Sequence, residues 1–102
     1  LWPDVAPRLA PYPSGAIAMR ALADTTGPGA VGCTQVTEIL YTPGVDLVGP
    51  LPPDFTLATM YSVAVGTHAP QPALARRFAA LLADPATRIL RERGGFVSPS
   101  DC

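Results

Sequence analysis

The sequence contains no lysine, one histidine and two cysteines, and these shortages limit the chemistry that it can support. Its seven cationic residues are all arginine and face eight acidic residues, so the formal net charge is −1. A nucleic-acid-binding surface needs more positive charge than this. The histidine, His68, and the cysteines, Cys33 and Cys102, have no usual metal-ligand spacing. We therefore expect no nucleic-acid partner, no metal and no cofactor.

Long apolar runs are also lacking. Proline and glycine interrupt every apolar stretch well short of the roughly 20 residues that a membrane-spanning helix needs. The 13 prolines and 9 glycines instead indicate many loops and short elements, while 48% hydrophobic residues predict a packed core. Because the chain begins at Leu1 without Met or a secretory leader, we expect a processed or truncated product, and the sequence leaves its export route open.

The two cysteines leave the redox compartment open as well. Cys33 falls in a short apolar stretch that is typical of a strand, so we expect a buried free thiol there. A disulfide between Cys33 and Cys102 is the alternative, and it would require an oxidising compartment.

Apolar periodicity and turn residues predict helices that alternate with short strands. Helices are expected to begin at Ser14, Thr34, Pro72 and Pro85, the last of them ending at Gly94. Strands are expected over residues 30–34, 45–48 and 57–67. This alternation predicts an α/β fold with a mixed sheet and flanking helices. So few strands would leave the sheet edges bare, and we expect them to support a homodimer.

No group of residues has the pattern of an enzyme active site. His68 lies in a loop bounded by proline, without a recognisable nucleophile or acid as partner. Glu38, Asp46 and Asp54 lack a second carboxylate at a useful spacing for acid–base catalysis. The glycine-rich turn at residues 27–29 follows a helix instead of a strand, which argues against a phosphate-binding loop. We therefore expect no enzymatic activity.

The starts of two predicted helices are the best candidates for a binding site. Ser14 and Thr34 would each place a hydroxyl beside unpaired backbone N–H groups at the positive end of a helix dipole. Such a position can bind an anion without a cationic side chain. Ser and Thr are also common N-caps, and Tyr61 has the pattern of a core aromatic, so purely structural roles stay open for all three.

Three motifs connect the chain to a known family. They are G-x-x-Q-x-x-E at residues 32–38, PGV-x-LVGPLP at residues 43–52, and L-x-x-P-x-x-R followed by GGF between residues 82 and 96. Together they resemble the C-terminal part of the periplasmic molybdate-binding proteins, which are substrate-binding proteins of ABC importers. The resemblance extends from about Ser14 to Phe96.

The resemblance implies a two-lobed, type 2 periplasmic-binding fold. Residues 1–54 would belong to the second lobe, and residues 55–102 would supply a return strand and the C-terminal helices of the first. It also implies molybdate or a similar oxyanion as ligand, an ABC permease as partner, a periplasmic or extracellular location, and no chemistry on the ligand. By resemblance, the ligand-binding residues are Ser14, Thr34, Gln35 and Tyr61.

Other functions stay open alongside this one. The same fold serves as a ligand-sensing effector module of transcription regulators, which an upstream helix-turn-helix would indicate. A small organic anion is another ligand class, although the arginines between Arg76 and Arg93 lie on the terminal helices and away from the predicted site. An enzyme has the least support, for want of a nucleophile with a base.

Overall fold

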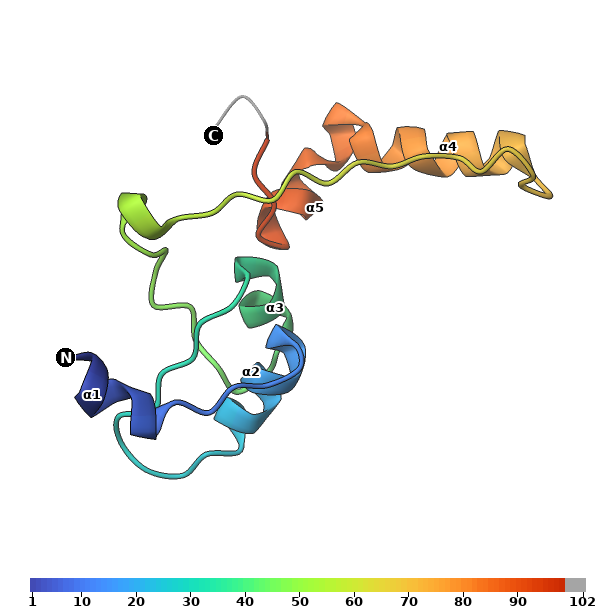
Figure 1. The fold of residues 1–102 in the computed structure, drawn as a ribbon. Helices are drawn as coiled ribbons and strands as arrows, with labels where there is room; N and C mark the ends of the chain where they lie inside the picture. The colour runs from blue at the N-terminus through green and yellow to red at the C-terminus, as the bar shows by residue number, and fades with distance from the viewer. Residues whose placement is uncertain (99–102) are drawn as a thin grey trace. The chain divides into compact units, whose positions relative to one another are not determined.

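The structure is a computed structural model that describes residues 1–98 (Figure 1). The chain divides into two compact units, residues 1–49 and the residues from Pro50 onward, called unit 1 and unit 2 below. Unit 1 contains α1 (Trp2–Val5), the 3-10 helix η1 (Ala6–Arg8), α2 (Gly15–Ala23) and α3 (Val36–Tyr41). Unit 2 contains the 3-10 helix η2 (Pro53–Phe55), α4 (Pro72–Ala83), the 3-10 helix η3 (Pro85–Thr87) and α5 (Arg88–Arg93).

Capping residues and prolines explain where these helices begin. Proline occupies the first turn of α1, η1, η2, α4 and η3, where its missing N–H leaves no helical bond unmade. Ser14 caps α2, since its Oγ accepts a hydrogen bond from the Ile17 N–H at 3.3 Å. Asp84 caps η3 in the same way, through the Ala86 N–H at 2.8 Å. The helix starts at Ser14, Pro72 and Pro85, and the end of α5 at Gly94, confirm the predictions from sequence.

The predicted α/β fold is wrong, because residues 1–98 form helices and turns but no strand. The segments 30–34, 45–48 and 57–67 have no ladder partner in this part of the chain. A strand requires a second segment to complete its backbone hydrogen bonds, and an alternating apolar pattern does not supply one. The described residues therefore offer no sheet edges through which a dimer could form.

The helices α2 and α3 lie side by side and pack together in unit 1 (Figure 1). Gly15, the first residue of α2, lies against Thr34 and Glu38 at the start of α3. At the other end, a Cβ added to Gly44 would lie 3.2 Å from the Cβ of Ala23, the last residue of α2. The two N-termini therefore lie at one end of the pair, and the two C-termini at the other.

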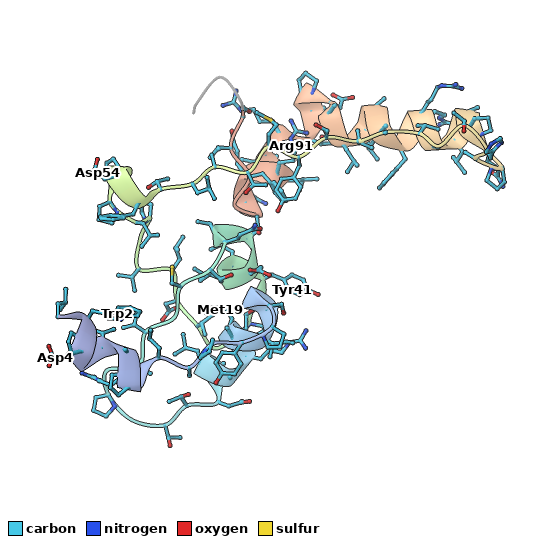
Figure 2. The ribbon with its side chains drawn as sticks, viewed as in Figure 1. Trp2, Asp4, Met19, Tyr41, Asp54 and Arg91 are labelled. Carbon is cyan, nitrogen blue, oxygen red and sulfur yellow. The ribbon has the colours of Figure 1, made fainter. Side chains whose placement is uncertain are left out.

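The buried core of unit 1 is small and centres on Met19 of α2 (Figure 2). Met19 is 1% exposed and is the only fully buried apolar side chain among the described residues. Gly32 passes so close above it that a Cβ at Gly32 would overlap the Met19 Cε. Thr42 closes the end of α3, since its Oγ1 donates to the Glu38 carbonyl at 2.8 Å.

Arg91 joins the end of α4 to α5 in unit 2 (Figure 2). Its Nη1 donates to the Leu82 carbonyl at 2.7 Å, to the Asp84 carbonyl at 3.0 Å and to Thr87 Oγ1 at 2.6 Å. The carbonyls at a helix C-terminus have no partner inside the helix, so a cationic donor there satisfies and stabilises them. This one side chain therefore fixes the corner between the two helices.

Replacing Met19 with alanine should lower the free energy of unfolding of unit 1 by about 2–5 kcal/mol, because a fully buried side chain is lost and a cavity is left. Denaturant unfolding followed by circular dichroism measures the change. Val31→Ala is the matched control, since Val31 is 88% exposed and its truncation should change stability by less than about 0.5 kcal/mol. Equal effects of the two substitutions would contradict a core centred on Met19.

Replacing Arg91 with alanine should destabilise the α4–α5 corner by about 1.5–3 kcal/mol, since hydrogen bonds from a charged donor contribute on that scale. Loss of the ellipticity at 222 nm with temperature is a suitable measurement. Arg93→Ala removes an equal charge from the exposed end of the same helix and should leave the transition almost unchanged. A transition shifted as far by Arg93→Ala would point to net charge as the cause.

Candidate functional site

Two of the predicted binding residues meet where α2 and α3 begin. Ser14 and Gly15 open α2, and Gly15 has no side chain to hold the neighbouring segment away. A Cβ at Gly15 would overlap both Thr34 Oγ1 and Glu38 Oε2. The helix start and these two polar groups are therefore in direct contact. We call this group of five residues, which also includes Gln35, the α2–α3 corner.

Thr34 does not cap α3, which corrects the expectation from sequence. The N-cap of α3 is Gln35, whose side chain makes no capping hydrogen bond. The Thr34 hydroxyl instead donates to Glu38 Oε2 within the first turn of α3. Because a hydroxyl has a single proton, Thr34 cannot donate to a ligand while this bond persists.

Glu38 is the charged residue of this corner, and the sequence interpretation did not select it. It occupies the third position of α3, where an acidic side chain is favourable beside the positive end of the helix dipole. The contact with Gly15 also places its carboxylate beside the start of α2. An acidic residue three positions after a helix cap was the available signal.

The other two predicted binding residues, Gln35 and Tyr61, belong to different units. Gln35 is exposed and directly follows Thr34, so it belongs to the same corner. Tyr61 belongs to unit 2, where it is 62% exposed. Its ring packs edge-on against Phe96, with the ring centroids 5.8 Å apart and the planes at 77°. Phe96 is held by the turn after α5, since its N–H donates to the Arg91 carbonyl at 3.0 Å.

The thiol and the imidazole show no arrangement for chemistry. Cys33 is exposed, so the expectation of a buried thiol is wrong. Cys102 lies outside the described residues, and the predicted alternative of a disulfide to it lies outside them too. His68 is exposed in a turn. Residues 1–98 contain no group of three histidine, cysteine or acidic side chains that could hold a metal ion.

A shallow hollow of about 380 Å³ lies at the opposite end of the same helix pair. Its lining residues are Arg20, Ala23, Asp24, Tyr41, Thr42 and Pro43. The hollow is open to solvent, and its charged groups are Arg20 in the last turn of α2 and Asp24 at the C-cap. None of the residues predicted to bind a ligand lies in it.

The α2–α3 corner has the donors of an anion site and already holds an anion. Helix N-termini supply backbone N–H groups, and Thr34 supplies a hydroxyl. The Glu38 carboxylate now uses that hydroxyl, and the missing side chain of Gly15 gives it access to the helix start. The corner can therefore accommodate one negative charge without a cationic side chain.

Comparison with known proteins identifies the protein family. A family model described as "Bacterial extracellular solute-binding protein" matches residues 1–97. The chain belongs to this family. No curated protein and no solved structure matches this solute-binding protein.

Membership of this family implies a location, two kinds of partner and a class of activity. Extracellular solute-binding proteins act in the periplasm or outside the cell, and a solute and a transporter are the partners that such a protein implies. Families of this kind generally bind their solute without converting it. In the part of the chain that the structure describes, no helix is both long and apolar enough to cross a membrane.

Replacing Gly15 with alanine should destabilise unit 1 by about 1–3 kcal/mol, because the new Cβ would force α2 away from Thr34 and Glu38. The sign of the change in unfolding free energy makes this test informative, since replacing glycine with alanine in an unobstructed helix stabilises the protein by roughly 0.5–1 kcal/mol. Denaturant unfolding gives the value. Gly49→Ala is the control, because nothing lies within 4 Å of a Cβ at that position. A Gly15→Ala protein as stable as the parent would refute the close contact.

Proposed function

We propose that this solute-binding protein captures molybdate or a similar oxyanion at the α2–α3 corner and delivers it to an ABC permease. The observation that supports the proposal is the Glu38 carboxylate, which lies at the start of α2 and accepts a hydrogen bond from Thr34. A corner in which a neutral hydroxyl donates to a carboxylate beside a helix start has chemistry that suits another oxyanion.

Binding would proceed as an exchange of anions. The Glu38 side chain would turn away, and the Thr34 hydroxyl would then donate to an oxygen of the ligand instead of to Oε2. Gly15 leaves room for that oxygen to approach the first backbone N–H groups of α2. The ligand gains donors that Glu38 gives up, so the net affinity depends on the difference between two similar sets of hydrogen bonds.

Such an exchange also provides a route to release. The departing oxyanion would be replaced by the Glu38 carboxylate, so the donors of the corner are not left unsatisfied when the ligand passes to the permease. Ser14, Gln35 and Tyr61 stay predicted contacts in this proposal and rest on the resemblance to molybdate-binding proteins. The predicted assignment of residues 1–54 and 55–102 to different lobes rests on it too.

Calorimetric titration with molybdate, with sulfate as the comparison anion, tests the proposal. In a Glu38→Gln background, where no carboxylate competes for the Thr34 hydroxyl, Thr34→Val should weaken molybdate binding about tenfold, the effect of losing one hydrogen bond to a charged group. Glu38→Gln should strengthen it severalfold, because the competing negative charge disappears. Thr37→Val is the matched control on the same helix and should bind as the parent does.

The direction of the Glu38→Gln effect separates the ligand classes. Stronger anion binding supports exchange at this corner. Weaker binding would mean that Glu38 accepts from the ligand, which fits a ligand that is rich in hydrogen-bond donors and contradicts an oxyanion. Absence of molybdate binding by the parent and by Glu38→Gln would overturn the oxyanion assignment and favour the organic-anion or sensor alternatives.

A further inference from the structure

The hollow at the C-terminal end of the α2–α3 pair contains two opposite charges that do not bond to each other. Its volume of about 380 Å³ is at the low end of the roughly 300–1,000 Å³ that is typical of small-molecule sites. Arg20 and Asp24 line it from positions i and i+4 of one helix surface. In the part of the chain that the structure describes, neither side chain forms an ion pair or a hydrogen bond. Both charges are therefore available to a ligand.

The position of Asp24 is unfavourable for the helix itself. Asp24 is the C-cap of α2, so its carboxylate lies beside the negative end of the helix dipole. The order of the two charges also disfavours an ion pair between them, because an acid that precedes a base at this spacing is the more stable order. A residue that breaks local rules in this way is more typical of a functional site than of a structural position.

The end of α3 supplies the rest of the hollow. Tyr41, the last residue of α3, is 82% exposed (Figure 2), and the face of an aromatic ring attracts a cation. Thr42 beside it is buried, and its Oγ1 already donates to the Glu38 carbonyl at 2.8 Å. Gly44 lets the following turn approach Ala23 closely. This wall is therefore held by contacts within the fold and is present before a ligand binds.

We propose that the hollow is a second binding site, which takes a small zwitterion such as a free amino acid or a betaine. The ligand carboxylate accepts hydrogen bonds from the Arg20 guanidinium, a strong pairing of charged groups. The ligand's ammonium group lies between the Asp24 carboxylate and the face of the Tyr41 ring. A ligand with a single charge would use only half of these groups. The hollow shares no residue with the α2–α3 corner, so this inference does not depend on the oxyanion proposal.

NMR titration of the full 102-residue chain with glycine betaine and with leucine tests the site. Both zwitterions should shift the amide signals of residues 20–24 and 41–42 in a saturable way. Arg20→Gln and Asp24→Asn should each weaken binding about tenfold, the effect of losing one contact between charged groups. Arg8→Gln and Asp46→Asn are the matched controls, since they remove the same charges from exposed positions of unit 1 outside the hollow, and they should bind as the parent does.

Singly charged probes separate a zwitterion site from a simple ion site. Acetate and tetramethylammonium each carry one of the two charges, and each should bind at least tenfold more weakly than glycine betaine. Tyr41→Leu should weaken the binding of glycine betaine, because its quaternary ammonium group depends on the ring face. Acetate that binds as tightly as both zwitterions, or the absence of saturable shifts with either zwitterion, would overturn the proposal. Circular dichroism at 222 nm establishes that each variant keeps its helices.

Discussion

The parallel pairing of α2 and α3 is the constraint on which unit 1 depends. Parallel helix dipoles repel, because their like ends lie together. The Glu38 carboxylate at the paired N-termini and the Arg20 cation in the last turn of α2 both offset this repulsion. Gly15 and Gly44 let the two backbones approach at the two ends. The candidate site and the hollow lie at the two ends of this arrangement.

Signals confined to a few residues were read correctly from the sequence. Ser14 and Asp84 act as caps, and α5 ends at Gly94, because each of these roles depends on hydrogen bonds to near neighbours. The predicted strands were wrong, because strand pairing depends on a distant partner that an alternating segment such as 57–67 does not specify. The local sequence pattern therefore predicted the wrong fold class, although it predicted several helix ends correctly.

The candidate site shows the same division between local and distant information. Thr34 was selected as a cap, yet its hydroxyl bonds Glu38, and the N-cap is Gln35. Glu38 lies on the start of α2 only because Gly15 has no side chain, which is a contact between segments that are far apart in the sequence. Periodicity contains no information on such a contact. The resemblance to molybdate-binding proteins selected Ser14, Thr34 and Gln35 of this corner, and it did not select Glu38.

The short range of the backbone hydrogen bonds affects how the molecule opens. Across residues 1–98, the backbone hydrogen bonds of the turns and caps join positions close in sequence, so one helix can open without breaking the backbone bonds of another. Amide hydrogen exchange should therefore be graded from segment to segment, with several openings of different free energy. A solute held where α2 and α3 begin has to slow exchange in both helices together. Protection that appears in these two and leaves α4 unchanged would distinguish capture of a ligand from a general tightening of the chain.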